Sequence, residues 1–226
     1  MIKVKICGLM NKKDVDICVK AGADMVGFVV EYPQPVPWNL TASEAKELIS
    51  LVSAPAEACI VTGGPVNKVL ALADELRPRI VQLHYRETLA DVRRTAKELS
   101  ALGIRTIKAL RFDKSGNCDF EITDPVLAAR ELSRTEIAAI VVDSYTEARP
   151  GGSGIVVDLS TFKTVQRESE VPVILAGGLN PDNIASIAAA TNPFGVDVLT
   201  GAETAPGRKD ESKIVQLMEA LSSHIC

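Results

Sequence analysis

Short apolar runs alternate with longer segments of helical hydrophobic spacing along the whole chain. The apolar runs have the length and β-branched content of strands, and the longer segments repeat apolar residues every three or four positions. The pattern predicts strands near residues 3–6, 25–30, 58–62, 80–83, 106–110, 138–142, 173–176 and 196–199. It predicts helices near residues 12–21, 42–51, 66–76, 88–102, 125–132, 159–168, 181–190 and 210–222.

This alternation of eight strands with eight helices predicts an α/β fold, a (β/α)8 TIM barrel of the phosphate-binding type. The run 139–142 has no polar residue, as expected when both faces of a parallel sheet are covered. An open doubly wound sheet is the alternative, but it needs a reversal of strand order and often has fewer strands. No linker rich in Pro or Ser divides the chain, so we predict one domain over residues 1–226.

Several helix ends carry their own signals. Asn180-Pro181 and Asp124-Pro125 each place a capping residue before a proline, which predicts a helix start. Gly22 and Gly103 are placed just past predicted helix ends, where glycine is common.

The composition narrows the function classes. The net charge is -4 and no block of like charges stands out, which argues against a nucleic-acid ligand. No apolar run reaches the ~20 residues of a membrane span, and the first residues read as a strand. We therefore expect a cytoplasmic protein without membrane contact. The 5 cysteines form no CxxC pair and no metal-ligand spacing with the 2 histidines, so we expect free thiols and no metal.

Polar and glycine residues follow the predicted strands, and in this fold the active site lies at the strands' C-terminal ends. In strand order these residues are Cys7-Gly8, Glu31, Thr62-Gly63-Gly64, His84, Arg111, Asp143, Gly177-Gly178 and Thr200-Gly201. A further cluster, Gly151-Gly152-Ser153-Gly154, lies in the loop after the sixth strand. Backbone amides without a Cβ can approach phosphate closely, so three glycine clusters at one barrel end favour a phosphate site over turn-making alone.

Cys7 and Asp143 are the candidate proton-transfer pair. A thiol with a lowered pKa can act as a general base, and a carboxyl with a raised pKa as a general acid. Each residue also has a structural interpretation: Cys7 as a buried core thiol, and Asp143 as a cap of the following turn. His84 is either a packing histidine or a substrate contact.

The chain resembles the phosphoribosylanthranilate isomerase family from end to end. The motifs that carry the resemblance are Lys5-Ile6-Cys7-Gly8-Leu9, Ala21-Gly22-Ala23-Asp24, Gly27-Phe28-Val29, Val81-Gln82-Leu83-His84, Val142-Asp143-Ser144, Gly151-Gly152-Ser153-Gly154, Leu175-Ala176-Gly177-Gly178-Leu179-Asn180-Pro181, Gly195-Val196-Asp197-Val198 through Gly201, Pro206-Gly207 and Lys209-Asp210.

The resemblance implies an Amadori rearrangement in tryptophan biosynthesis, from N-(5-phosphoribosyl)anthranilate to 1-(o-carboxyphenylamino)-1-deoxyribulose 5-phosphate. It implies Asp143 as the general acid that opens the ribose ring and Cys7 as the general base at C2. It implies no metal or organic cofactor, because the iminium formed on the substrate is the electron sink. The small phosphorylated substrate would be held at Gly152, Gly154, Gly177, Gly178, Gly201 and Ala202. We expect a monomer or a homodimer.

The chain departs from the family at the anthranilate end. The family places an arginine after its second strand to bind the anthranilate carboxylate, but no Lys or Arg occurs here between Lys20 and Lys46. Tyr85 replaces a usual glycine, and Leu199-Thr200-Gly201-Ala202 replaces a usual serine-serine-glycine-valine. Arg111, Arg86 or Arg149 could supply the charge; we predict Arg111, with Trp38 covering the ring. His84 and Asp197 are further candidates at this end.

Two alternatives remain open from the sequence. One is a related barrel isomerase that acts on another phosphoribosyl amine. The other is a non-catalytic protein that binds a phosphorylated ligand, although such a protein has no need of an acid–base pair.

Overall fold

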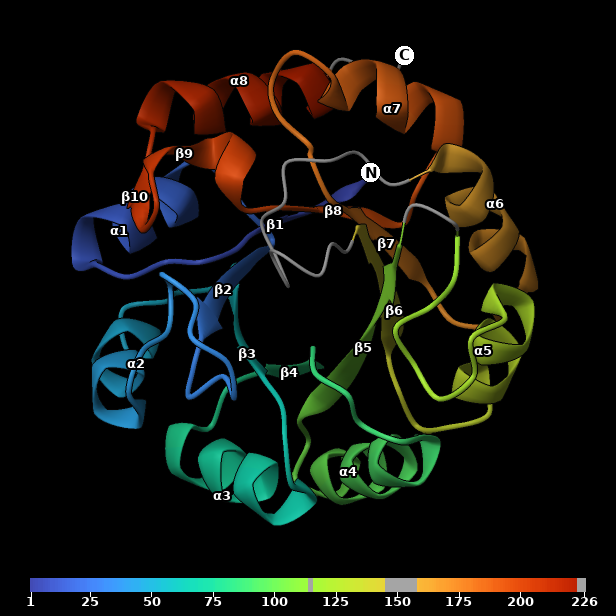
Figure 1. The fold of residues 1–226 in the computed structure, drawn as a ribbon. Helices are drawn as coiled ribbons and strands as arrows, with labels where there is room; N and C mark the ends of the chain where they lie inside the picture. Colours follow the sequence, from blue (N-terminus) through green and yellow to red (C-terminus); the bar gives the residue numbers. More distant parts are fainter. Residues whose placement is uncertain (114–115, 145–157, 223–226) are drawn as a thin grey trace.

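A computed structural model describes residues 1–113, 116–144 and 158–222. Eight parallel strands form a closed barrel, and helices surround it (Figure 1). The barrel strands are β1 (Lys3–Ile6), β2 (Met25–Val29), β3 (Glu57–Thr62), β4 (Ile80–Leu83), β5 (Arg105–Phe112), β6 (Ala139–Ser144), β7 (Val173–Ala176) and β8 (Gly195–Val198). The helices are α1 (Lys12–Lys20), α2 (Ala42–Ile49), α3 (Val66–Leu76), α4 (Leu89–Ala101), α5 (Pro125–Ser133), α6 (Leu159–Glu168), α7 (Ile184–Thr191) and α8 (Glu211–Ser222).

The barrel closes between its first and last strands. β1 pairs in parallel with β8, from Lys3 opposite Gly195 to Ile6 opposite Val198. Every other strand pairs in parallel with its neighbour in sequence, so the strand order never reverses. This order confirms the predicted barrel and excludes the open doubly wound sheet.

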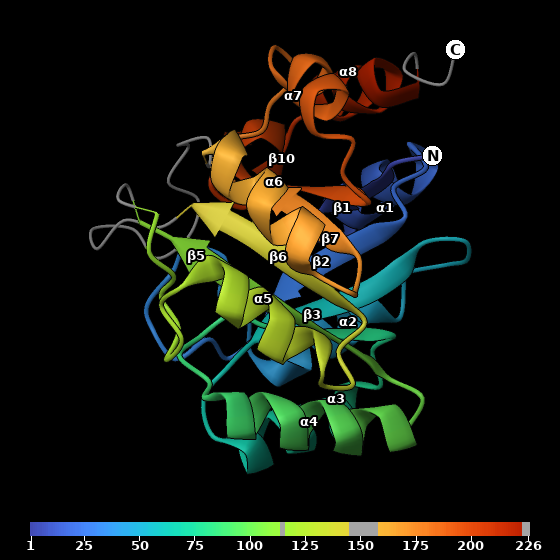
Figure 2. The same ribbon diagram turned by 90° about the vertical axis from the view of Figure 1, so that its right-hand side faces the viewer.

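Two apolar layers hold the barrel together. The inner layer is formed by Met25, Cys59, Ile80, Ile107, Ala109, Ala139, Val141, Ile174 and Ala176. The outer layer packs the opposite faces of the strands against the helices, with buried residues such as Phe28, Leu83 and Phe162. Figure 2 shows α5 and α6 covering the barrel from the side. Because both faces of each strand are buried, the strands lack polar alternation, as predicted.

Local signals set most helix boundaries. At the start of α2, the Thr41 side chain accepts a hydrogen bond from the backbone N–H of Glu44. The Glu44 carboxylate accepts one from the backbone N–H of Thr41, and the two bonds form a capping box. Asp124 caps α5, whose first residue is Pro125, as predicted. Gly22 and Gly103 follow the ends of α1 and α4 with positive φ, also as predicted.

The predicted start of the seventh helix is wrong. Asn180 does not cap a helix at Pro181; its side chain accepts hydrogen bonds from the backbone N–H groups of Asp182 and Asn183. The Asn183 side chain in turn accepts from the Asn180 N–H. These reciprocal bonds stabilise a turn, so α7 begins only at Ile184.

The strand ends also differ from the prediction. β5 runs to Phe112 and β6 to Ser144, so Arg111 and Asp143 lie within their strands rather than after them, opposite each other in register. After β8 the chain forms a 3-10 turn, η1 (Thr200–Ala202), and a hairpin of β9 (Glu203–Ala205) and β10 (Arg208–Lys209) that the sequence pattern did not predict. Two or three residues per strand are too few for a periodic signal.

None of the helices in the described parts of the chain is long and apolar enough to cross a membrane. The prediction of a single domain over residues 1–226 stays a prediction.

Candidate active site

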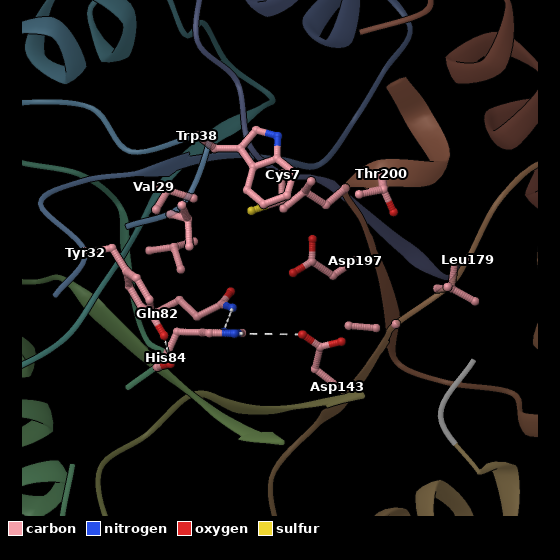
Figure 3. A pocket seen from close by; sticks show the side chains of 16 residues that line it. Cys7, Val29, Tyr32, Trp38, Gln82, His84, Asp143, Leu179, Asp197 and Thr200 are labelled. Atoms are coloured by element: carbon pink, nitrogen blue, oxygen red, sulfur yellow. Dashed lines mark hydrogen bonds and ion pairs between the residues drawn. The ribbon is translucent and has the colours of Figure 1, made fainter. Parts of the chain in front are cut away.

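A cavity opens at the C-terminal ends of the barrel strands, and Figure 3 shows its lining. Its empty volume is about 720 Å³, including the solvent at its mouth. The lining residues come from six of the strands, all but β1 and β5, and from the loops after β1, β2, β4, β7 and β8: Cys7, Val29, Tyr32, Val36, Trp38, Val61, Gln82, His84, Asp143, Ala176, Gly177, Gly178, Leu179, Asp197, Leu199 and Thr200. The cavity therefore brings together most of the residues that the sequence predicted.

Cys7 lies directly after β1, and its backbone N–H donates to the carbonyl of Val198 at 2.9 Å. Its thiol is buried in the cavity wall together with Val29, Val61 and Trp38. Burial raises the pKa of the thiol above its ordinary value, whereas the Lys5 ammonium acts in the opposite direction by its charge and by a hydrogen bond. A thiolate at Cys7 thus has a cation beside it.

Lys5 and Asp197 form a buried ion pair next to Cys7. The Lys5 Nζ lies 2.6 Å from Asp197 Oδ2. Burial disfavours the Lys5 charge, but Asp197 and the neighbouring thiols outweigh it and raise the pKa of Lys5, so the ammonium stays charged. Asp197 lines the cavity, and its buried Oδ1 has no hydrogen-bond partner among the described residues. An unsatisfied buried acceptor is costly, so a donor on a bound ligand would stabilise this site.

Asp143 faces the same cavity from β6 (Figure 3). Its Oδ1 accepts a hydrogen bond from the backbone N–H of Ser144 at 2.8 Å. Burial and then the charge of Asp197 raise the pKa of Asp143 to about 7, against the opposing effects of the Ser144 N–H and Arg111. A carboxyl with this pKa is substantially protonated near neutral pH, as a general acid requires.

His84 lies between Gln82 and Asp143. Its Nδ1 is 3.1 Å from Gln82 Nε2, and its Nε2 is 3.8 Å from Asp143 Oδ2. Burial, followed by the positive charges of Arg111 and Lys108, holds the pKa of His84 well below its usual range, so the ring is neutral. In the tautomer in which Nδ1 accepts from the Gln82 amide, the ring proton is on Nε2 and faces Asp143. His84 is therefore a neutral donor at the cavity wall rather than the cation of an ion pair.

The glycines after β7 and β8 lie where the sequence predicted a phosphate site. Gly177 has a φ of +87°, and a Cβ there would lie 2.7 Å from the Ser144 hydroxyl. A Cβ on Gly201 would lie 1.9 Å from the carbonyl oxygen of Leu179, so the loops after β7 and β8 meet only because Gly201 has no side chain. Ala202 is buried in η1 beside them. Gly152 and Gly154 lie outside the described residues.

The opposite end of the cavity is apolar and aromatic. Val29, Tyr32, Val36, Trp38 and Val61 form it, and no Lys or Arg is among the described residues that line the cavity.

Arg111, the predicted cation at this end, lies behind the lining residue Tyr32. It is buried, forms an ion pair with Asp119, and its Nη1 lies 3.5 Å from the Tyr32 hydroxyl. Arg86 lies 3.8 Å from the same Asp119. Arg149 lies outside the described residues. Arg111 therefore does not line the cavity, and the side chain of Tyr32 lies between them.

Lys5 and Gln82 are functional candidates that the sequence did not single out. The sequence pattern could have indicated both residues, because each is a charged or amide side chain inside a strand that is buried on both faces. Such a group needs a partner or a function. Among the described side chains, no three His, Cys, Asp or Glu residues gather in a way that could hold a metal ion.

The fold and the cavity define a class: a (β/α)8 barrel that holds a thiol, a carboxyl group and two glycine residues in one cavity at the C-terminal ends of its strands. Residues 4–220 match the family model described as N-(5'phosphoribosyl)anthranilate (PRA) isomerase, and the chain belongs to this family.

Individual relatives agree with the family model. The N-(5'-phosphoribosyl)anthranilate isomerase of Methanopyrus kandleri is 36% identical over 99% of this chain and 100% of its own length. That of Methanosarcina acetivorans is 31% identical over 96% of this chain and 92% of its own. The crystal structure of phosphoribosyl anthranilate isomerase from Thermotoga maritima has a TM-score of 0.81 and 28% identity, covering 99% of this chain and 100% of that one.

Proposed function

We propose that this protein is a phosphoribosylanthranilate isomerase that converts N-(5-phosphoribosyl)anthranilate into 1-(o-carboxyphenylamino)-1-deoxyribulose 5-phosphate in tryptophan biosynthesis. The observation that carries the proposal is the pair Cys7 and Asp143 in one cavity, with glycine loops at one end and an aromatic wall at the other. A similar phosphoribosyl anthranilate isomerase, with a TM-score of 0.78 and 27% identity over 99% of this chain, has been crystallised with reduced 1-(o-carboxyphenylamino)-1-deoxyribulose 5-phosphate.

In the first step, Asp143 donates its proton to the ribose ring oxygen. The bond from that oxygen to C1 breaks while the nitrogen lone pair forms a C1=N double bond, which gives an iminium and an open-chain hydroxyl. The raised pKa of Asp143, about 7, suits a group that must carry this proton at neutral pH.

In the second step, the Cys7 thiolate removes the proton from C2. The electron pair of that C–H bond forms a C1=C2 double bond as the C=N pair returns to nitrogen, and the resulting enolamine tautomerises to the ketone. C2 is oxidised and C1 is reduced within one molecule, so the reaction is an intramolecular oxidoreduction of the aldose–ketose type. The iminium accepts the electrons, and the proposal includes no cofactor.

Two buried groups support these steps in the proposal. The Lys5 ammonium stabilises the Cys7 thiolate, and the unpartnered Oδ1 of Asp197 accepts a hydrogen bond from a substrate hydroxyl. The enzyme would work in the cytoplasm as a monomer or homodimer, without nucleic acid or membrane.

The proposal is tested by genetic complementation. The chain should restore growth without tryptophan to a strain that lacks this isomerase, and the Cys7→Ala variant, produced at the same level, should not. Growth that depends on neither Cys7 nor Asp143 would contradict the assigned mechanism. Failure of the soluble wild-type protein to complement would contradict the substrate assignment.

The phosphate should bind between the loops after β7 and β8. Crystals soaked in inorganic phosphate should show the anion beside Gly177, Gly178 and Gly201. Gly201→Ala should raise KM by at least about tenfold, because the added Cβ displaces the Leu179 carbonyl and so separates the loops after β7 and β8. The control is Gly103→Ala, where no atom lies within 4 Å of the added Cβ; it should lower stability through its positive φ and leave KM unchanged. An anion bound only elsewhere would count against the assignment.

Arg111 is our proposed partner for the anthranilate carboxylate, with its guanidinium moving from Asp119 toward the substrate. A charge-assisted hydrogen bond is worth about 1.5–3 kcal/mol, so Arg111→Met should raise KM roughly tenfold or more and largely spare kcat. The variant should lose less with a substrate analogue that lacks the carboxylate. The control is Arg130→Met, which removes an exposed ion pair between Arg130 on α5 and Glu168 on α6. An unchanged KM in Arg111→Met would show that the cation lies elsewhere.

One observation favours a second candidate function. The loop after β2 has no Lys or Arg, and none lines the cavity among the described residues. If single replacements of Arg86, Arg111 and Arg149 all leave KM unchanged, the natural substrate is a phosphoribosyl amine without that carboxylate.

A further inference from the structure

Trp38, the single tryptophan of the chain, forms one wall of the cavity. It belongs to the loop after β2, and it packs on Gly8, where an added Cβ would lie 3.0 Å from the ring. Figure 3 shows the six-membered ring directed toward the Cys7 sulfur and the indole nitrogen directed away from Asp143 and Asp197. The apolar six-membered ring of the indole is therefore on the side of Cys7 in the cavity, and the indole N–H is turned to the protein.

The polar edge of Trp38 binds a buried ion pair. Its Nε1–H donates to Glu203 Oε1 at 2.9 Å, and the Lys209 Nζ lies 2.9 Å from the same oxygen. The Gly207 N–H also donates to this oxygen at 3.1 Å. Trp38, Glu203 and Lys209 are only 6%, 6% and 7% exposed. Buried in this way, the pair gives the indole a fixed acceptor that solvent does not compete for.

The same ion pair is continuous with the glycine loop after β8. Glu203 directly follows η1, and the Lys209 Nζ also donates to the carbonyl of Leu199, the residue before that turn, at 3.3 Å. Leu199 and Thr200 line the cavity together with Trp38. One buried pair thus contacts both the loop at the glycine end and the aromatic wall.

We propose that Glu203 and Lys209 are positioning residues that hold Trp38 as the surface on which the aromatic amine of the substrate packs. Trp38 is then the specificity-determining residue of the amine end, and its place is set by the hairpin that follows the phosphate loop. The inference rests on the proposed function for the identity of the aromatic group. The positioning of Trp38 by Glu203 is independent of it.

The experiment compares wild type, Glu203→Gln, Trp38→Phe and the double variant. Emission from the only tryptophan reports on Trp38 alone. In Glu203→Gln this emission should shift to the red, and acrylamide should quench it several-fold more efficiently than in wild type. KM for the phosphoribosyl amine should rise about tenfold, the factor of a charge-assisted hydrogen bond, while kcat changes little. The control is Glu75→Gln, an exposed glutamate on α3 that does not line the cavity, which should change neither quenching nor KM.

Trp38→Phe keeps an aromatic ring and removes the N–H donor. It therefore tests the hydrogen bond between Trp38 and Glu203 without leaving Lys209 unpaired. It should raise KM on its own, and in its background Glu203→Gln should change KM by less than about twofold. Unchanged acrylamide quenching in Glu203→Gln would overturn the proposal. An equal rise in KM when Glu203→Gln is introduced into wild type and into Trp38→Phe would also overturn it, because loss of stability alone predicts that result. If wild type turns over no phosphoribosyl amine, the proposed function fails, whereas the quenching comparison still decides whether Glu203 positions Trp38.

Discussion

Cys7→Ala should lower kcat about 10³-fold while the protein stays folded. Cys7 is the proposed base, its thiol lies at the end of β1 beside the Lys5 ammonium, and positioned general bases contribute roughly 10²–10⁴-fold. The measurement is the steady-state rate with N-(5-phosphoribosyl)anthranilate, together with the thermal midpoint. Substrate binding should persist, because the phosphate and amine ends of the cavity are untouched.

Cys18→Ala is the matched control for this variant. Cys18 is also fully buried, but it lies in α1 and does not line the cavity. Its replacement should lower the thermal midpoint slightly through the lost sulfur and leave kcat unchanged. A Cys7→Ala variant that retains near-normal kcat would remove Cys7 from the mechanism and return it to the role of a core thiol.

Asp143→Asn should lower kcat to a similar extent, because the amide cannot donate a proton to the ribose ring oxygen as a carboxylic acid does. The side chain keeps its size, and the amide oxygen of the variant could still accept the Ser144 N–H. Asp24→Asn at the N-terminal end of the barrel, where Asp24 pairs with Lys3, is the control and should affect stability only. Turnover by Asp143→Asn at the wild-type rate would assign the acid to another group.

The pH profile gives the pair a second test. The active form has Cys7 ionised and Asp143 protonated, and the pKa of Asp143, about 7, is below the raised pKa of Cys7. The active form therefore carries one proton on the pair. Because the thiol has the higher pKa, most molecules with one proton carry it on Cys7 and only a small part carry it on Asp143. Activity is proportional to the whole singly protonated population. Activity should rise with pH through about 7 and fall only when the thiol loses its proton. A profile that already falls as pH rises through this value would contradict the order of pKa values.

The fold was largely predictable from sequence because each βα unit carries its own signal. Buried strands read as apolar runs, helices have a period near 3.6, and caps such as Asp124 mark their ends. The errors occurred where side-chain bonds compete with the helix, as at Asn180, and where elements are too short for a period, as in β9 and β10. Neither feature changes the hydrophobic pattern.

The strand ends and their residue types predicted part of the cavity lining: Cys7, Asp143, Gly177 and Thr200 line the cavity, whereas Arg111 and Gly201 do not. The sequence could not predict the pairings. Lys5 with Asp197 and Trp38 with Glu203 join residues 192 and 165 positions apart. Only closure of the barrel between β1 and β8, and the hairpin after β8, bring these partners together. The pKa values follow from that burial and not from residue type.

An Amadori rearrangement by Cys7 and Asp143 in one cavity can be measured directly as product formation. The purified protein is incubated with N-(5-phosphoribosyl)anthranilate, and 1-(o-carboxyphenylamino)-1-deoxyribulose 5-phosphate is quantified by chromatography, beside Cys7→Ala and Asp143→Asn. We expect catalytic turnover by the wild type and a loss of about 10³-fold in each variant. Absence of the product with folded wild-type protein, or equal rates in all three proteins, would contradict the proposed reaction and its acid–base pair.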